Sequence, residues 1–415
     1  MPHHELLLLV CPLLMFDSSR YVISGLALWC VDMIHDGLSF FRTEMPSSYS
    51  YCPSVCVVVA GLNEADGLER GLSNIWGTYP RLEIIVVDDG SSDGMSEVAH
   101  RFARHHQGIR VITKQRGGKS AAMNAALPLT SAEVIVIVDA DSELGNQAIW
   151  EIVQPLQNAN VAAVAGNVMV RNTKTNLLTA FQSFEFLRSI LLGRMVSSRI
   201  GTLGIVSGAF GAFRKSVLDR VGGWDVGPGE DEDIVLRIRK IGYRIEFAPY
   251  AECYTDVPEK LKVLTKQRRR WEWAVVTFES RKHIDMALPN QAHFSWSNFF
   301  LFMERWVFNL LLPLWCWIGL GWIALVQPAV SLLYIAMLYL SLYAFNEFVL
   351  YLLILYYTDH KARDAKLIWV VPLLPFYQAY QRFVTTWAIL EEMLTRRSFR
   401  DSFVPAHVRQ MTWKW

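Results

Sequence analysis

The sequence predicts an α/β domain with a doubly wound sheet, set between an N-terminal and a C-terminal membrane region. Three apolar, β-branched runs have the pattern of buried parallel strands: 55–60, 84–87 and 134–138. Helical stretches alternate with these runs, at 66–75, 95–105 and 119–127. Because strands and helices alternate, we expect the polar residues that follow the strands to meet at one edge of the sheet. Ligands bind at that edge in open α/β sheets.

Composition and charge narrow the class of protein. The 415 residues suffice for a catalytic domain and a second unit, and 52% of them are hydrophobic. A formal net charge of +1 argues against a nucleic-acid partner. Lys and Arg gather at 262–282 and 396–414, beside apolar segments, which is typical of a membrane surface. The six cysteines lack a zinc-binding spacing, which favours free thiols in a reduced compartment.

The N-terminal region predicts one retained transmembrane helix near 20–41, preceded by a short apolar helix at 6–16. The 11 residues of that short stretch span about 16 Å as a helix, against about 30 Å of hydrocarbon. Two full spans are the alternative. The first residues lack the basic start of a signal peptide.

The C-terminal region predicts two spans, at 305–326 and 329–357. The next apolar segment, 367–390, contains Pro372 and Pro375 and lies between two basic stretches. An ordinary crossing there would place those stretches on opposite faces, so we expect a re-entrant or interfacial hairpin. Glu304-Arg305 and Asn346-Glu347 are costly inside a bilayer, and they indicate either a polymer channel or interfacial depth.

These features divide the chain into five expected parts. They are an N-terminal membrane segment at 1–45, a cytoplasmic catalytic domain at 46–257, amphipathic interface helices at 258–298, a transmembrane region at 299–392 and a basic tail at 393–415.

Polar residues follow the first two predicted strands. Asn63-Glu64 come after the first, and Asp88-Asp89 come after the second. Their oxygens can accept hydrogen bonds from uracil N3–H and from ribose hydroxyls. The alternative is helix capping and turn chemistry, which Asp, Gly and Ser supply in any loop.

Asp139 and Asp141 end the third strand. Carboxylates at i and i+2 on a strand end can bear on one hard cation, Mg²⁺ or Mn²⁺, together with substrate phosphates. Such a metal would neutralise a departing diphosphate. Gly117-Gly118-Lys119, which opens a helix, suits a phosphate through its backbone N–H groups and its ammonium, with a simple glycine turn as the alternative.

Two later motifs complete the set. Glu230-Asp231 begin a run of four acids before a helix, which exceeds what helix capping needs, so a general base is favoured over a dipole-stabilised helix start. In the stretch from Gln267 to Trp271, Arg270 can bind a diphosphate and Trp271 can stack on a sugar. The alternative is a membrane-surface helix, which is our interpretation of Arg268 and Arg269.

In this order the motifs resemble those of processive, membrane-embedded family 2 glycosyltransferases, which include cellulose, hyaluronan, chitin-oligosaccharide and poly-N-acetylglucosamine synthases. The resemblance covers about 50–285. It implies a GT-A (Rossmann-like) fold, a UDP-sugar donor, Mg²⁺ or Mn²⁺, and inversion to a β-linkage. Accessory export subunits and a bacterial inner-membrane location are further expectations.

The resemblance also implies roles for residues. Asp231 is the expected base, and Asp139 and Asp141 the expected metal ligands. The expected UDP-sugar ligands are Asn63, Glu64, Asp88, Asp89, Lys119, Asp139, Asp141, Gln267, Arg270 and Trp271. The expected acceptor site comprises Ser207, Gly208, Ala209, Phe210, Trp224, Glu230 and Trp271.

Departures from the family pattern, such as Gly229 where Thr is frequent, affect the choice of substrate. The stretch 166–172 is closer to the poly-N-acetylglucosamine and chitin-oligosaccharide branches, which favours a UDP-GlcNAc donor and a growing glycan acceptor. The alternatives are a UDP-glucose-using β-glucan synthase, a non-processive enzyme that glycosylates a lipid, and a non-catalytic subunit of an export complex.

Overall fold

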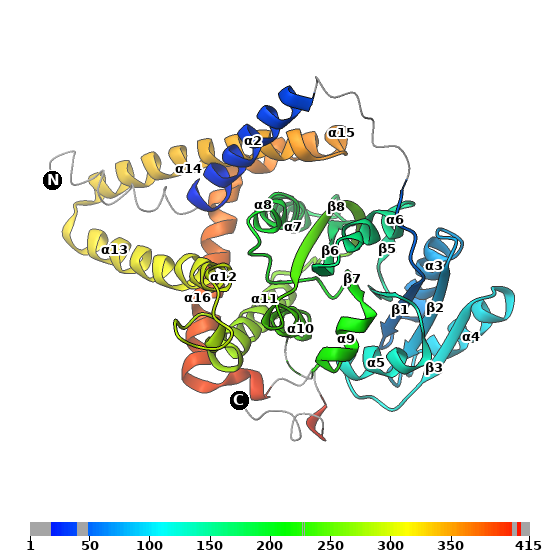
Figure 1. Ribbon diagram of the computed structural model, residues 1–415. Helices are drawn as coiled ribbons and strands as arrows, with labels where there is room; N and C mark the ends of the chain where they lie inside the picture. Colours follow the sequence, from blue (N-terminus) through cyan, green and yellow to red (C-terminus); the bar gives the residue numbers. More distant parts are fainter. Residues whose placement is uncertain (1–17, 40–48, 226, 228, 401–404, 408–415) are drawn as a thin grey trace.

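The computed structural model describes residues 18–39, 49–225, 227, 229–400 and 405–407 (Figure 1). Its centre is an eight-stranded sheet in the order β3-β2-β1-β4-β7-β6-β8-β5. The strands are β1 (Val55–Gly61), β2 (Leu82–Asp88), β3 (Ile109–Thr113), β4 (Val134–Asp139), β5 (Glu143–Leu144), β6 (Val161–Val170), β7 (Phe210–Arg214) and β8 (Arg244–Thr255).

The sheet is mixed. β1 pairs in parallel with β2 and β4, and β2 pairs in parallel with β3, as a doubly wound sheet requires. β7 is antiparallel to both of its neighbours, β4 and β6. The three predicted strands, β1, β2 and β4, are therefore confirmed as parallel neighbours, whereas the sheet as a whole is mixed rather than doubly wound. An apolar run predicts a buried strand but does not encode its direction, which depends on how the connecting helices pack.

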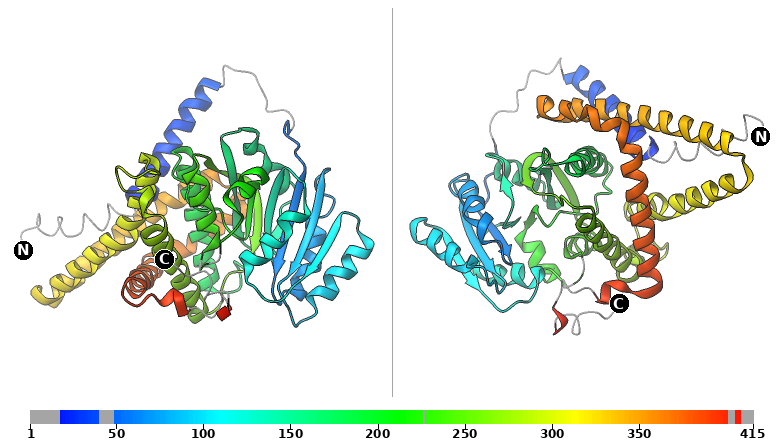
Figure 2. Two further views of the ribbon diagram at one scale, coloured as in Figure 1. Left: turned by 60° about the horizontal axis from the view of Figure 1, so that its bottom comes forward. Right: turned by 180° about the vertical axis from the view of Figure 1, so that it is seen from behind.

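Helices cover both faces of the sheet (Figures 1 and 2). Three of them confirm the predicted helical stretches: α3 (Ala65–Ile75), α4 (Met95–His105) and α5 (Lys119–Ala126). The others of this region are α6 (Ala148–Val153), α7 (Leu177–Phe186), α8 (Gly193–Arg199), α9 (Lys215–Val221) and α10 (Glu230–Lys240). A π-helical turn, η4 (Leu187–Leu192), joins α7 to α8. Short 3-10 turns are η2 (Leu127–Leu129) and η3 (Gln154–Gln157).

A second set of helices follows the sheet domain. α11 (Leu261–Val275) continues into the π-helix η5 (Val276–Lys282) and then the 3-10 turn η6 (Ile284–Met286). α12 (Trp296–Trp306) runs through η7 (Val307–Leu311) into α13 (Leu312–Val326). The remaining helices are α14 (Ala329–Tyr357), α15 (Lys361–Asp364), η8 (Ala365–Leu373), α16 (Leu374–Thr395) and η9 (Arg397–Arg400).

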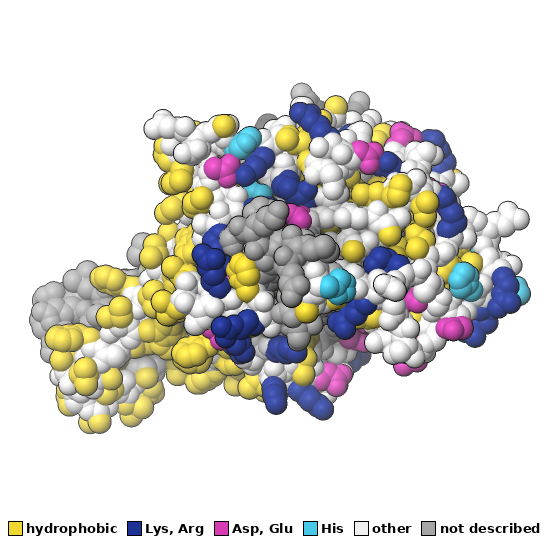
Figure 3. Space-filling model, turned by 90° about the horizontal axis from the view of Figure 1, so that it is seen from below, with side chains coloured by type: hydrophobic (Ala, Val, Ile, Leu, Met, Phe, Trp, Pro, Cys, Tyr) yellow, Lys and Arg dark blue, Asp and Glu magenta, His cyan; other side chains and the backbone are white. Residues whose placement is uncertain are grey.

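Among the described residues, two helical stretches are long and apolar enough to cross a membrane, Trp296–Val326 and Ala329–Tyr357. The second coincides with a predicted span. The first begins before the predicted residue 305, because Glu304 and Arg305 lie inside one continuous helix. In Figure 3 apolar side chains gather on the part of the molecule that projects to the left, where α13 and α14 meet.

The N-terminal helix lies at the predicted position. η1 (Ser18–Ile23) and α2 (Ser24–Ser39) form it, and α2 contacts α14 (Figure 1). Neither is one of the two stretches that meet the length and hydropathy requirement, so a crossing here stays a prediction. The predicted short helix at 6–16 lies outside the described residues.

The segment 367–390 was expected to form a proline-kinked hairpin, and its two prolines lie where a 3-10 helix meets a long α-helix. Pro372 lies in the 3-10 helix η8, and Pro375 lies in the first turn of α16. A 22-residue helix follows in place of the expected hairpin, and it packs on α11. Its polar side chains find partners on the sheet domain, which the one-dimensional pattern of apolar residues does not show.

Candidate active site

The ends of three strands bring two predicted acidic residues to one edge of the sheet. Gly61 at the end of β1 pairs with Asp88 of β2, and Ala60 pairs with Asp139 of β4. The two aspartates therefore lie on either side of β1, as the alternation of strands and helices predicts. This edge collects the side chains that the sequence assigns to nucleotide and metal.

Asp89 holds the glycine loop that opens α5. Its buried carboxylate accepts hydrogen bonds from the N–H groups of Gly117 at 2.9 Å and Gly118 at 2.7 Å, and pairs with Lys114 Nζ at 2.7 Å. Gly118 has φ +87°, which glycine adopts without strain. Asp89 thus shapes the loop from which Lys119 projects, and its direct contact with UDP stays a prediction.

Asn63 and Asp88 close the neighbouring loops. The Asn63 N–H donates to Ser91 Oγ at 2.9 Å, and the Ser92 N–H donates to Asn63 Oδ1 at 2.9 Å. Asp88 Oδ1 accepts from the Ser91 N–H at 2.8 Å. These are the turn contacts that the sequence allowed as an alternative, so the nucleotide-binding roles of both residues stay predictions.

Glu64, Asp139 and Asp141 form what we name the strand-end cluster. Burial raises the pKa of Glu64 to about 7, and the charges of Asp141 and Asp139 add to this shift. Burial also raises the pKa of Asp141, again with a contribution from Asp139. Carboxylates that repel one another in this way favour a bound cation.

Lys119 joins the strand-end cluster to the start of α10. Its Nζ pairs with Asp139 Oδ1 and donates to the carbonyl oxygen of Gly208 at 3.1 Å. Burial alone would lower the pKa of Lys119, but the charges of Asp139 and Glu230 raise it above its ordinary value. The ammonium therefore stays protonated between the two acidic groups.

The donor set at the strand ends fits a hard divalent cation. Within the described part of the chain, no group of three or more His, Cys, Asp or Glu side chains is arranged to hold a metal. Mg²⁺ is commonly held by one or two carboxylates plus substrate phosphates, and Asp139 and Asp141 can supply that share. Asp139 ends β4 and Asp141 follows two residues later, and burial together with the charge of Asp139 raises the pKa of Asp141, which supports the fit.

Asp231 lies in the first turn of α10, close to Gly208. Its Oδ2 accepts a hydrogen bond of 3.4 Å from the Gly208 N–H, and its Oδ1 accepts one of 3.0 Å from the Glu232 N–H. Burial raises the pKa of Asp231, while the charge of Lys119 and these two hydrogen bonds oppose the rise. Burial and the charge of Asp231 raise the pKa of Glu230. A carboxylate with a raised pKa is a better proton acceptor at neutral pH.

The segment 207–210 connects these acidic groups. Ser207 Oγ accepts a hydrogen bond of 2.8 Å from Nη2 of the buried Arg194, and the Ala209 carbonyl accepts one of 3.2 Å from the Asp139 N–H. Phe210 is fully buried in β7. Of the predicted acceptor segment, the structure therefore brings Gly208 next to Asp231.

Trp224 lies beneath the site. Its side chain is 3% exposed and meets Phe213 edge to face, with ring centroids 5.4 Å apart. Its backbone is clamped by Asn124, which accepts from the Trp224 N–H at 2.8 Å and donates to the Trp224 carbonyl at 2.7 Å. Contact of Trp224 and Phe210 with an acceptor stays a prediction.

Two arginines of α11 attach this helix to its neighbours. Arg268 is buried and pairs with Glu185 of α7 at 2.7 Å, and Arg269 pairs with Glu391 of α16 at 2.6 Å. Both arginines therefore have carboxylate partners within the protein, and an interfacial position of α11 stays a prediction. Basic residues on an amphipathic helix give the same sequence pattern whether their partners are lipids or carboxylates.

The other residues of this motif are placed differently. Trp271 is 44% exposed, and the Arg268 guanidinium lies over its ring at 4.3 Å. Gln267 and Arg270 are half-buried on α11. Contacts of these three residues with a diphosphate or a sugar stay predictions.

Gly229, the residue before Glu230 and Asp231, allows α11 to pack closely against the start of α10. A Cβ atom at position 229 would lie 2.5 Å from the Ala274 Cβ, which is too close for any side chain. The chain therefore needs glycine where the family often has threonine. This close approach places the helix that carries Trp271 against the residue before Glu230.

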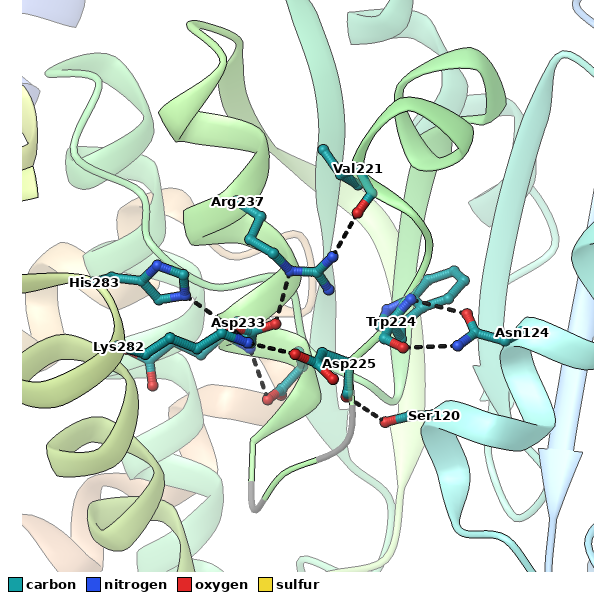
Figure 4. Close-up of polar contacts among 11 residues, drawn as sticks. Ser120, Asn124, Val221, Trp224, Asp225, Asp233, Arg237, Lys282 and His283 are labelled. Carbon is teal, nitrogen blue, oxygen red and sulfur yellow. Dashed lines mark hydrogen bonds and ion pairs between the residues drawn. The ribbon is translucent and has the colours of Figure 1, made fainter. Parts of the chain in front are cut away.

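Sequence reasoning missed several residues of the site. Arg194 lies in a helix to which no motif was assigned, and Asp225, Lys282 and His283 surround the acidic start of α10 (Figure 4). The extension of the basic segment to Lys282 was the available signal. It was assigned to the membrane surface because its buried partners are distant in sequence.

Comparison with known proteins identifies the family. The family described as "Glycosyltransferase like family 2" matches residues 53–274, which is more than half of the chain. The chain is a family 2 glycosyltransferase. This match begins just before β1 and ends in α11, so it includes every motif discussed above.

Relatives agree with this assignment, and a solved structure shares the fold. The glycosyltransferase is 31% identical over 254 residues to a poly-β-1,6-N-acetyl-D-glucosamine synthase of Staphylococcus epidermidis, covering 59% of this chain and 61% of the relative. The Staphylococcus aureus (strain MSSA476) synthase matches equally at 31%. A mannosyltransferase from Pyrobaculum calidifontis, solved with GDP-Man and Mn²⁺, superposes with a TM-score of 0.61 and 21% identity over 93% of this chain and 99% of its own. That likeness shows the GT-A fold.

Proposed function

We propose that this glycosyltransferase transfers sugar from a UDP-sugar to the end of a growing β-linked polysaccharide at a membrane, with inversion and with product export. The observation that carries the proposal is the position of Lys119, which contacts Asp139 on the metal side and lies beside Asp231 and Glu230 on the acceptor side. One ammonium group therefore lies next to both the proposed metal ligand and the proposed base.

The donor is proposed to be UDP-GlcNAc. The relatives that match at 31% identity are poly-β-1,6-N-acetyl-D-glucosamine synthases. The chain covers 61% of their length, so the nature of the polymer is inferred from the catalytic part.

Asp231 is proposed as the general base. Its carboxylate takes the proton from the acceptor hydroxyl while the hydroxyl oxygen forms the new bond to C1 of the donor sugar, and the bond from C1 to the UDP oxygen breaks. Asp139 and Asp141 would hold Mg²⁺ or Mn²⁺, which supplies positive charge to the departing diphosphate. Lys119 adds fixed positive charge at the same place, and such preorganised charge stabilises the developing negative charge.

Two groups are proposed to assist substrate binding. Asp88 and Asp89 would orient UDP through the loops that they hold, and Arg270 and Trp271 would meet the diphosphate and the acceptor end. The five-part division of the chain, a cytoplasmic catalytic domain and a bacterial inner-membrane location are proposals that rest on the two apolar stretches and the basic segments beside them.

The test is incubation of the purified protein with individual UDP-sugars and Mn²⁺ or Mg²⁺, followed by product mass and linkage analysis. We expect a ladder of β-linked N-acetylhexosamine. A single glycolipid product would contradict polymer synthesis, and a glucose ladder would contradict the donor assignment. The absence of UDP release with every UDP-sugar would contradict the function as a whole.

A further inference from the structure

A second charged cluster lies beside the base and has no part in the chemistry described above. We name Asp225, Asp233, Arg237, Lys282 and His283 the Lys282 cluster (Figure 4). Lys282 Nζ pairs with Asp225 Oδ2 at 2.6 Å and with Asp233 Oδ1 at 2.8 Å. Asp233 also meets His283 Nε2 at 2.8 Å and Arg237 Nε at 2.8 Å.

The cluster fixes both ends of the segment that carries the base. Asp225 precedes Glu230 and Asp231 in the chain, and Asp233 follows them on the same helix, α10. A single ammonium group, that of Lys282, contacts the carboxylates at both ends. The side chain of Lys282 comes from η5, the continuation of the helix that carries Trp271, so the cluster links that helix to the base.

The start of the segment is held from a second direction. Ser120 Oγ donates to the Asp225 carbonyl at 2.8 Å, and Asn124 clamps the backbone of Trp224 (Figure 4). Both partners lie on α5, whose first residue is Lys119. Trp224 and Asp225, before the base, are therefore held from α5, and Asp225 and Asp233 are held from η5.

The charges of the cluster are matched. Asp233 is fully buried, and although burial would raise its pKa, His283, Arg237 and Lys282 hold that pKa below its ordinary value. Asp233 is thus ionised, and Lys282 and Arg237 stabilise its buried negative charge. Removing one partner of a buried ion pair is strongly unfavourable, because the other charge stays buried without compensation. Loss of Lys282 would accordingly remove an ion pair of Asp225 and leave Asp233 with less positive charge.

We propose that Lys282 is a positioning residue for Asp231, which rests on the proposed function of Asp231 as the base. By holding Asp225 and Asp233 together, Lys282 keeps the first turn of α10 where Asp231 accepts from the Gly208 N–H. A displacement of about 1 Å at a reacting group lowers rates on the order of 10²-fold. The expected effect is therefore on turnover rather than on donor binding.

The kinetic test compares K282M and K282R with a matched control, K215M. Lys215 makes an ion pair of similar length, 2.7 Å, with Asp219 on its own helix, α9. We expect K282M to lower kcat by about 10²-fold with little change in KM for the UDP-sugar, K282R to recover part of the loss, and K215M to behave as the wild type. Equal loss in K282M and K215M, or a loss confined to KM, would overturn the proposal.

A second measurement does not depend on activity. The N–H groups of Glu232 and Asp233 donate to the Gly229 carbonyl at 3.2 Å, and their hydrogen exchange reports the first turn of α10. We expect faster exchange at 229–233 in K282M than in K215M. Unchanged exchange would overturn the positioning role, whereas a wild-type protein that forms no product would count only against the proposed function.

A milder variant serves if K282M does not fold. The Asp225 side chain is 34% exposed, and D225N leaves the pair between Lys282 and Asp233 in place. We expect a smaller loss of kcat and faster exchange at 229–233. Wild-type kinetics and exchange in D225N would contradict the role of the Lys282 cluster.

Discussion

Two groups of carboxylates in this molecule have opposite surroundings. In the strand-end cluster, Glu64 and Asp141 have raised pKa values because burial and neighbouring acids disfavour their charge. On α10, Asp233 lies among cations, with Lys282 and Arg237 each at 2.8 Å. The three carboxylates of the first group have one paired cation, Lys119 on Asp139, whereas Asp233 alone pairs with Lys282 and Arg237.

This difference separates a ligand site from a structural site. Buried charges that belong to the fold are compensated by other residues, because an uncompensated buried charge destabilises the native state. Acids that crowd one another at a strand end are stabilised when a cation arrives. Lys119 contacts Asp139 of the strand-end cluster, and the charges of Glu230 and Asp231 act on it from the other side.

The largest expected effect comes from removing the base. D231N should lower kcat by roughly 10²- to 10⁴-fold, since that is the range of general base catalysis. UDP affinity should be unchanged because Asp231 accepts its hydrogen bonds from the N–H groups of Gly208 and Glu232, not from residues at the strand ends. The measurements are UDP release and a UDP titration, with D219N on α9 as the control. Retained synthesis by D231N would place the base elsewhere.

The next largest effect is expected on stability, when the arginine that pairs with two buried glutamates is removed. Arg305 pairs with Glu232 at 2.6 Å and with Glu279 at 3.2 Å, so it links the first apolar stretch to α10. R305M should lower the free energy of unfolding by about 3–5 kcal/mol, because two buried carboxylates would then face each other. Thermal unfolding in detergent would show the change.

Arg244 supplies the control for this prediction. Its contact with Glu246 is 3.9 Å long and half-exposed, so R244M should change stability little. A similar loss of stability in R305M and R244M would contradict the prediction that the ion pairs of Arg305 contribute more to stability than an exposed pair.

A third prediction uses the pH dependence of the strand-end cluster. The folded-state pKa of Glu64, about 7, lies above its ordinary value, so Glu64 is protonated below pH 7 and ionised above it. A cation prefers the ionised form, so Mn²⁺-UDP affinity should rise by up to about tenfold per pH unit as the pH approaches 7 from below. Titration calorimetry at pH 6 and 7 measures this. In E64Q the affinity should depend less on pH, and an identical dependence would assign the proton to another group.

The smallest effect is expected at the partly exposed pair between Arg269 and Glu391, whose side chains are 30% and 17% exposed. Ion pairs of this kind contribute about 1 kcal/mol or less, so R269M should shift the unfolding midpoint slightly and leave kcat and KM unchanged. Steady-state kinetics are the check. A large loss of activity would indicate that Arg269 contacts substrate.

The comparison of the two carboxylate groups shows how far sequence reasoning reaches. The strands that end in Asp88 and Asp139 could be predicted because a buried parallel strand reads as a continuous apolar run. The antiparallel direction of β7 could not, since the same run suits either direction. The ion pairs of Arg268 and Arg269 could not be predicted either, because their carboxylate partners, Glu185 and Glu391, lie far away in the sequence.

The sequence by itself determined strands β1, β2 and β4, helices α3, α4 and α5, the acidic strand ends, the acidic start of α10 and the two apolar stretches, because each depends on residues close together in the chain. Only the tertiary structure decided which charges meet. Lys119 contacts Asp139, Lys282 contacts both Asp225 and Asp233, and Gly229 admits α11. Such contacts join residues that are distant in sequence, and their energies depend on burial, which a local pattern does not contain.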